Sequence, residues 1–181
     1  MLDATIFDNN FFHEREKKEF NFWKEGSIEE IDEKDRILLN ALHKNGKETL
    51  LNLASKAGLS IDATSKRIKK LNDKKIICFY TTSINYTLLG YEKYKLFIEM
   101  KNYSNNFEEE FYGFLRKYKE TLNVIKTIGP WKFEVEFLIS NYEEFQKIIS
   151  ELQKKFPDFI SKTNFSIFRN EIWFPSKNLL I

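Results

Sequence analysis

The stretch LASKAGLSIDATSKRIKKL, residues 53–71, decides how the first half of this chain is interpreted. Apolar residues recur at helical spacing just before and inside it: Leu50, Leu53, Ala54 and Ala57. This stripe predicts a helix that ends at Gly58, because glycine takes the left-handed conformation of a helix C-terminus most easily. The Ser60 hydroxyl can then accept a backbone N–H at the start of another helix, which we expect to extend to about Asn72.

A further helix is predicted upstream, where Asp32 can cap the start and KNGK at 44–47 supplies the stop. Three short helices with a glycine turn between the last two describe a helix-turn-helix unit, whose last helix can enter the DNA major groove. On that helix Thr64, Ile68 and Leu71 are expected to be buried. The candidate DNA-binding residues are Ser60, Asp62, Ser65, Lys66, Lys69 and Lys70.

The positive charge of the chain is concentrated in this region. Residues 32–76 carry eleven basic and six acidic groups, whereas residues 1–31 carry four and eight, and residues 77–181 carry fourteen and thirteen. Such a patch attracts a polyanion. A charge run alone also fits an ordinary solvated helix face, so the placement on a helix-turn-helix unit is what favours DNA.

Composition excludes several other classes of protein. Cys78 is the only cysteine and His13 and His43 are the only histidines, so an internal disulfide and a Cys/His zinc cluster are both excluded. No apolar run approaches the roughly 20 residues that cross a bilayer, and the first residues do not have the order of a secretory signal. We expect a soluble, cytoplasmic protein without a metal or other cofactor.

The second half predicts an α+β domain. β-branched and aromatic residues at 74–84 indicate a strand that leaves the helical unit, followed by a connection. Beyond it the expected order is strand, helix, strand, strand, helix, strand, at residues 91–101, 107–120, 123–129, 132–140, 142–156 and 163–174. This βαββαβ order is ferredoxin-like, with a four-stranded antiparallel sheet covered by two helices on one face.

Alternation along the predicted strands places Phe97, Leu138 and Phe168 on the face that the helices leave uncovered, among charged residues that could pair across strands. An open sheet face with large apolar residues is a candidate dimer interface. A solvated sheet with a few aromatic residues is the alternative interpretation.

From Ile31 to about Phe174 the chain resembles the leucine-responsive/asparagine regulator (Lrp/AsnC) family of prokaryotic transcription regulators. The matching segments are IDEKDRILLNAL, LASKAGLS, RIKKL, II and LGY in the linker, and TIGPWKFEVEF. The resemblance implies a winged or hairpin-flanked helix-turn-helix at 31–76, a strand and linker at 77–90, and an effector (RAM-type) domain at 91–176. It also implies dimers formed through the sheets, often higher oligomers, binding to pseudo-palindromic promoter DNA, and a small amino acid as effector.

Two features depart from the family pattern. The family's effector turn carries an acidic residue shortly after the glycine, whereas here Trp131 and Lys132 follow Gly129 and Pro130. These four residues are the candidate effector-binding set, in which Lys132 would hold a carboxylate or simply cap its strand. The second departure is an aromatic-rich N-terminal extension at 1–30, which we interpret as an extra strand, a remnant of a duplicated effector domain, or an acidic arm.

The sequence therefore predicts a transcription regulator that binds specific double-stranded DNA as a dimer or larger oligomer and catalyses no reaction. One alternative is an interaction module that has lost DNA binding and modulates a related regulator. Another is an enzyme similar to the sirohaem decarboxylases that share this two-domain layout. Those enzymes use histidine and arginine in the effector half, where this chain has only Arg116 and Arg169.

Overall fold

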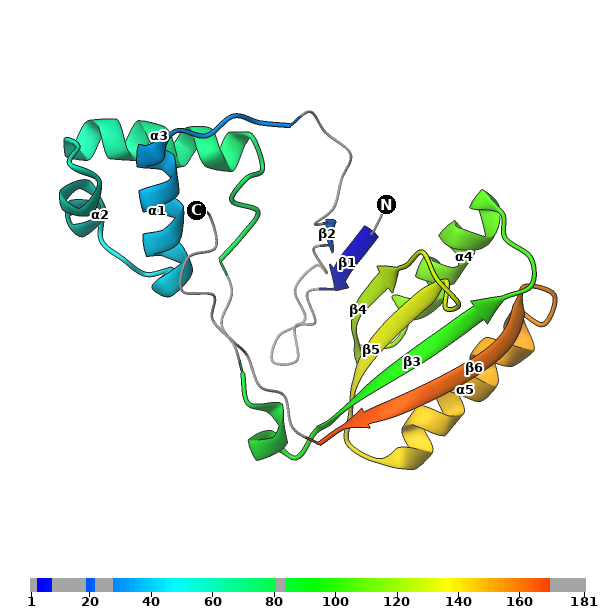
Figure 1. Ribbon diagram of the computed structural model, residues 1–181. Helices are drawn as coiled ribbons and strands as arrows, with labels where there is room; N and C mark the ends of the chain where they lie inside the picture. The colour runs from blue at the N-terminus through cyan, green and yellow to red at the C-terminus, as the bar shows by residue number, and fades with distance from the viewer. Residues whose placement is uncertain (1–2, 8–18, 22–27, 81–83, 170–181) are drawn as a thin grey trace. The chain divides into compact units, whose positions relative to one another are not determined.

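A computed structural model describes residues 3–7, 19–21, 28–80 and 84–169 of the 181-residue chain. The chain divides into two compact units (Figure 1). One contains three helices, and the other contains an antiparallel sheet with two helices. Each unit is described by itself below. Within the described ranges, no helix is both long and apolar enough to span a membrane.

The helical unit contains the three predicted helices, which are α1 (Glu33–Lys44), α2 (Leu50–Ala57) and α3 (Ile61–Asp73). Each begins at a capping side chain. Asp32 accepts the backbone N–H of Asp35, Thr49 accepts that of Asn52, and Ser60 accepts that of Ala63. These bonds satisfy N–H groups that a helix start leaves without an intrahelical partner. The three predicted helices and the predicted caps Asp32 and Ser60 are confirmed, whereas the cap Thr49 was not predicted.

The turn between α2 and α3 depends on Gly58. Its φ of 62° and ψ of 45° lie in the left-handed region, which glycine enters without the penalty that a Cβ brings. The backbone N–H of Leu59 donates to the carbonyl of Ala54 at 2.9 Å, which closes the turn. Only Leu59 then separates Gly58 from Ser60, the cap of α3.

Small and aliphatic side chains hold the three helices together. Leu38 and Ala41 of α1 pack with Leu53 and Ala57 of α2, and Ile68 of α3 packs against this cluster. Thr64 is fully buried, and its hydroxyl donates to the carbonyl of Ser60 at 2.9 Å. The hydroxyl of this core threonine therefore has its hydrogen-bond partner at the start of its own helix. Ile68, which was also expected to be buried, is only partly buried.

The strand predicted at 74–84 is not formed in its described part, residues 74–80 and 84. Helix α3 ends in a turn in which Lys75 takes a φ of 58° and the backbone N–H of Ile76 donates to the carbonyl of Leu71. The β-branched composition is typical of a strand. A strand also requires a neighbour for its backbone groups, and no described segment of this chain lies beside residues 74–80 in register.

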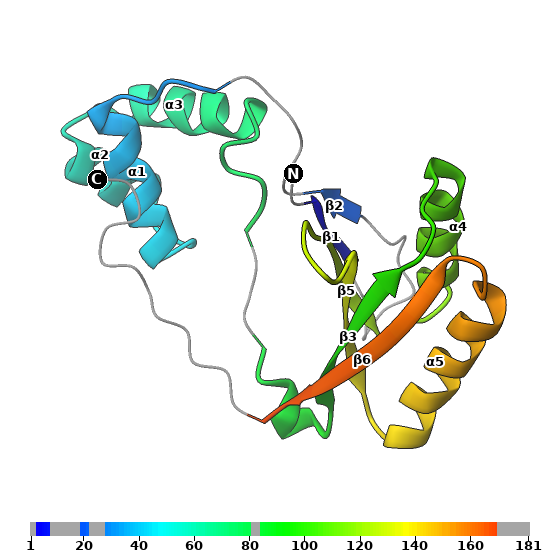
Figure 2. The same ribbon diagram turned by 45° about the vertical axis from the view of Figure 1, so that its right-hand side comes forward.

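The second unit is built on four antiparallel strands, which are β3 (Glu92–Met100), β4 (Thr121–Lys126), β5 (Phe133–Ile139) and β6 (Ile160–Phe168). They stand in the order β4-β5-β3-β6. Helices α4 (Asn105–Leu115) and α5 (Tyr142–Lys155) lie on one face of this sheet (Figures 1 and 2). The predicted ferredoxin-like arrangement is confirmed. Before it, the short helix η1 (Tyr86–Leu89) forms part of the connection, and the predicted last strand starts earlier than expected.

Two N-terminal strands extend the same sheet. β1 (Asp3–Phe7) pairs antiparallel with β4, so that Thr5 lies opposite Val124, and β2 (Glu19–Asn21) pairs antiparallel with β1. The sheet therefore has six strands in the order β2-β1-β4-β5-β3-β6. Of the three interpretations of the N-terminal extension, this pairing corresponds to extra strands.

The core of this unit lies between the sheet and its two helices and is rich in phenylalanine. The stacked rings of Phe107 and Phe111 have centroids 5.3 Å apart, and Phe111 lies 4.8 Å from Phe133 of β5. From α5, Phe145 contacts Tyr94 of β3 with centroids 4.4 Å apart. Alternation along β3 places Tyr94, Leu96 and Ile98 in this core, so Lys93, Lys95 and Phe97 lie on the opposite face.

Candidate nucleic-acid interface

The exposed side of α3 carries all the residues that the sequence analysis selected for DNA contact. Ser60, Asp62, Ser65, Lys66, Lys69 and Lys70 are all exposed. Because successive residues are about 100° apart around a helix axis, Asp62, Ser65, Lys66 and Lys69 form one face. Thr64 and Leu71, which are buried, lie on the opposite side. The helix therefore presents a polar, largely cationic surface to solvent.

The basic residues near α3 are of two kinds. Lys66, Lys69 and Lys70 have no ion pair with any described residue, so their ammonium groups are available to external anions such as phosphates. Arg67 and Lys74, in contrast, bind carboxylates of the same unit: Lys74 pairs with Glu29, and Arg67 pairs with two aspartates. Only part of the positive charge seen in the sequence is therefore free.

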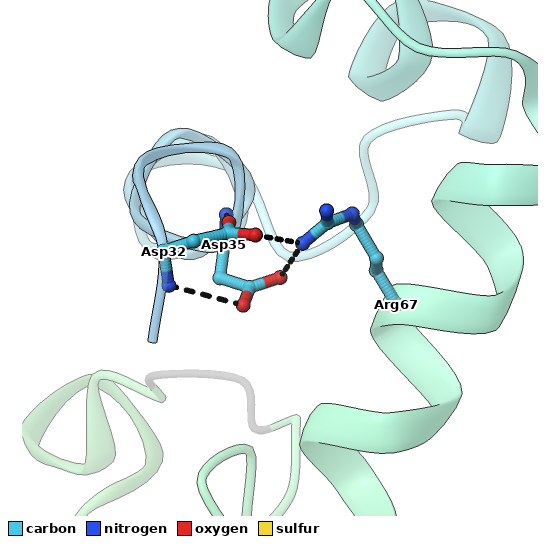
Figure 3. A network of polar contacts seen from close by, with 3 residues as sticks. All are labelled: Asp32, Asp35 and Arg67. Carbon is cyan, nitrogen blue, oxygen red and sulfur yellow. Dashed lines mark hydrogen bonds and ion pairs between the residues drawn. The ribbon is translucent and has the colours of Figure 1, made fainter. Parts of the chain in front are cut away.

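Arg67 joins α3 to the start of α1 (Figure 3). Its Nη1 lies 2.7 Å from Oδ2 of Asp32 and 2.8 Å from Oδ1 of Asp35. The two aspartates also form a capping box, in which each carboxylate accepts the backbone N–H of the other residue. Arg67 was expected to be one of the free basic groups of residues 32–76, and this cluster was not predicted. Two aspartates three residues apart at a helix start, with a lone arginine among lysines, were the available signal.

The contacts within the cluster favour the ionised forms of Asp32 and Arg67. The pKa of Asp32 is held below its ordinary value, first by the backbone N–H of Asp35 and then by the guanidinium of Arg67. The pKa of Arg67 is raised by hydrogen bonds to Asp35 and Asp32. Asp35 is a buried charge, with a side chain only 7% exposed, so its pairing matters more than that of a surface carboxylate.

The predicted effector-binding residues lie in the turn between β4 and β5. Gly129 and Pro130 are exposed. Trp131 packs on Phe97 of β3 with ring centroids 5.8 Å apart. The ammonium of Lys132 lies 4.8 Å from the ring centroid of Tyr103, and no described carboxylate pairs with it. Its backbone N–H donates to the carbonyl of Ile98 at 2.8 Å, so Lys132 also joins the turn to β3.

A second polar cluster, which the sequence analysis did not select, lies beside this turn. The ammonium of Lys126 is 2.8 Å from Oε2 of Glu108, and the hydroxyls of Tyr103 and Tyr112 donate to the same carboxylate. Burial alone would raise the pKa of Glu108, but these bonds lower it below its ordinary value. Because its oxygens are occupied, Glu108 is not free for a ligand, whereas Lys132 is.

The uncovered sheet face contains the predicted cross-strand ion pairs. Lys95 lies 3.1 Å from both Glu134 and Glu136, and Lys93 lies 3.3 Å from Glu136. The amide of Asn123 also donates to Glu136 at 2.8 Å. Glu136 is 7% exposed. Burial of an unpaired carboxylate would be strongly unfavourable, and these ion pairs and the hydrogen bond from Asn123 offset that cost.

Of the three predicted interface residues, two keep exposed surface. Phe97 and Phe168 are half-buried, and the ammonium of Lys93 lies 4.7 Å from the centroid of the Phe168 ring. Leu138 is 0% exposed within the single chain, so its inclusion needs correction. Alternation gives the direction of its side chain but not what covers it, and a side chain without exposed surface offers no area to a partner.

Comparison with known proteins gives three kinds of match. The family model of the AsnC-type helix-turn-helix domain matches residues 31–72. The HTH-type transcriptional regulator FL11 of Pyrococcus abyssi is 31% identical over 119 residues, which are 66% of this chain and 78% of that protein. LrpA of Pyrococcus horikoshii is 44% identical over 61 residues, which are 34% of this chain and 43% of that regulator.

A solved structure shows the same fold over most of the chain. The transcriptional regulator NMB0573 of Neisseria meningitidis, crystallised as a complex with L-Met, superposes with a TM-score of 0.68 at 18% identity. The superposition covers 82% of this chain and 96% of that one. At this low identity the likeness shows the fold alone.

We predict that Asp32→Asn removes an acid-sensitive part of the stability of the helical unit. Asparagine still caps a helix, but it loses the charge that binds Arg67. Because the folded-state pKa of Asp32 is depressed, its contribution is present above the ordinary aspartate pKa of about 4 and is lost as pH falls through the folded value. Thermal unfolding from pH 7 to pH 2 should show the variant less stable at neutral pH and converging with the unaltered chain in acid. A difference in thermal stability between the two chains that does not change with pH would contradict this prediction.

Proposed function

The chain belongs to the Lrp/AsnC family of helix-turn-helix transcription regulators, and from this premise we propose that it binds promoter DNA through the exposed face of α3. The observation that carries the proposal is the set of exposed lysines on that helix, Lys66, Lys69 and Lys70, which no described carboxylate neutralises. Lysine ammonium groups in such a position bind phosphates, and in this proposal Ser65 and Asp62 reach base edges. No chemical step is required.

Two copies of the chain bind together in this proposal. A single short helix contacts few base pairs, so useful selectivity requires two helices at a fixed spacing of about one turn of DNA or a multiple of it. The uncovered sheet face supplies a surface for this association. It carries Phe97 and Phe168 beside the paired lysines and glutamates of β3 and β5, a mixture of apolar anchors and satisfied charges that suits a protein interface.

The effector in this proposal is a small amino acid, held at the turn between β4 and β5. Lys132 supports this, because its ammonium rests on the Tyr103 ring without a described carboxylate partner and could bind an amino-acid carboxylate. The adjacent Trp131 and Phe97 rings supply apolar surface for a side chain. That one matched structure is a complex with L-Met agrees with this class of ligand.

The double substitution Lys66→Ala with Lys69→Ala should weaken DNA binding without unfolding the protein, since both side chains are exposed. If each lysine neutralises one phosphate, the slope of log affinity against log salt should fall by about 0.9 per lysine. Fluorescence anisotropy with duplex DNA at several salt concentrations measures both quantities. The matched control is Lys147→Ala with Lys154→Ala on α5, which removes the same charge from exposed positions of the other unit. Equal losses of DNA affinity and salt slope in the two double variants would show that α3 is not the DNA-binding surface.

Substitution of Phe97 by Asp should disrupt the proposed dimer. It would place a charge on the uncovered face next to Glu134, its neighbour in register, where like charges repel. Sedimentation velocity should then show monomers, and DNA affinity should drop with the loss of the second copy. Tyr142→Asp on α5, at an exposed residue, is the control and should keep the association state of the unaltered chain. Unaltered chains that are already monomeric would refute the proposed dimer.

Titration calorimetry with the twenty amino acids should find at least one ligand. Lys132→Ala should weaken its binding about tenfold or more, the change that accompanies loss of one charge-assisted hydrogen bond. Lys101→Ala, at an exposed lysine of another loop, should leave binding unchanged. Absence of heat for every amino acid at millimolar concentration, or unchanged binding in Lys132→Ala, would remove the effector role from this turn.

A further inference from the structure

Arg67 is the basic residue of α3 whose hydrogen bonds are directed into the protein. A single nitrogen, Nη1, binds Asp32 at 2.7 Å and Asp35 at 2.8 Å. These partners lie 35 and 32 residues away in the sequence, at the first turn of α1. The cluster therefore ties the middle of α3 directly to the start of another helix (Figure 3).

The two aspartate side chains are held by hydrogen bonds that do not involve Arg67. The backbone N–H of Asp35 donates to Oδ1 of Asp32 at 2.9 Å, and the backbone N–H of Asp32 donates to Oδ2 of Asp35 at 3.3 Å. The remaining oxygen of each carboxylate receives Nη1 of Arg67. All four oxygens are thus engaged, so the aspartates form a rigid acceptor whose position is set by the backbone of α1.

The position of Arg67 on α3 argues against direct contact with DNA. At about 100° per residue, Arg67 is about 200° from both Ser65 and Lys69, so it faces away from the centre of the exposed face. The cluster of one arginine and two aspartates also carries one net negative charge. Such a cluster repels phosphate, whereas the unpaired Lys66 and Lys69 attract it.

We propose that Arg67 is a positioning residue for DNA recognition: the Asp32–Asp35 acceptor holds the guanidinium and thereby fixes the rotation of α3, so that its exposed face meets the bases in one register. This role rests on the proposed function. Phosphate contacts tolerate small rotations because long lysine side chains adjust, but base-edge hydrogen bonds do not. Loss of the cluster should therefore reduce discrimination between DNA sequences more than it reduces general affinity.

The test uses the full-length protein, with Arg67→Gln, Asp35→Asn and the double variant. A preferred duplex is first selected from random DNA with the unaltered chain, and affinity for it and for random duplex is then measured at several salt concentrations. Each single variant should lower the ratio of specific to random affinity about tenfold, the change expected for one charge-assisted hydrogen bond. The salt slope should stay unchanged, and the double variant should lose no more than the worse single one.

Two controls separate positioning from other effects. Lys66→Gln should reduce the salt slope by about 0.9. This variant gives the reference value for the loss of one phosphate contact. Asp32→Asn keeps the helix cap but removes one of the two bonds to Arg67. Asp32→Asn should give a smaller loss of discrimination between sequences at an unchanged salt slope. If circular dichroism shows that Asp35→Asn does not fold, Asp32→Asn replaces it in the test.

The outcomes distinguish this role from the proposed function itself. If the unaltered chain shows no salt-dependent DNA binding, the proposed function fails. If it binds and selects DNA but Arg67→Gln reduces the salt slope as Lys66→Gln does, while Asp35→Asn leaves discrimination intact, Arg67 is a phosphate contact and only the positioning role is refuted. Additive losses in the double variant would likewise show that the two residues act independently.

Discussion

The left-handed turn at Gly58 is the constraint on which the helical unit depends. It turns the chain at the end of α2, so that Ser60, the cap of α3, follows only two residues later. A Cβ at Gly58 would be strained at a φ of 62° and would stand 3.4 Å from the ammonium of Lys34. A longer or more flexible connection would leave the start of α3 less firmly placed against α2, and the side chains that contact it from α1 would have to find it anew.

In the sheet unit, the alternation along β3 decides which side chains lie in the core. A shift of one residue in register would exchange Tyr94, Leu96 and Ile98 for Lys93, Lys95 and Phe97. The pairing of Lys95 with Glu136 on one side and Ser166 on the other fixes this register from both neighbouring strands. The same register places buried Glu136 within reach of two lysines and Asn123, so the core and the charged outer face are specified together.

Local sequence signals predicted the parts of the structure that local chemistry determines. Ser60 as a cap and Gly58 as a helix end each depend on a few neighbouring residues, and each was confirmed. The strand expected at 74–84 failed because a strand needs a partner as well as a composition. The burial of Leu138 and the pairing of β1 with β4 depend on contacts between distant segments, which a local pattern does not specify.

The charges of the candidate interface show why counting basic residues in the sequence was only partly informative. Arg67 and Lys74 are bound by Asp32, Asp35 and Glu29, residues that precede or begin α1. The acidic residues therefore remove positive charge from the sides of α3 and leave Lys66 and Lys69 on its exposed face. A uniformly cationic helix could lie against DNA in many orientations. A helix whose free charges are confined to one face, with an anionic cluster on the other, is electrostatically favoured in a single orientation.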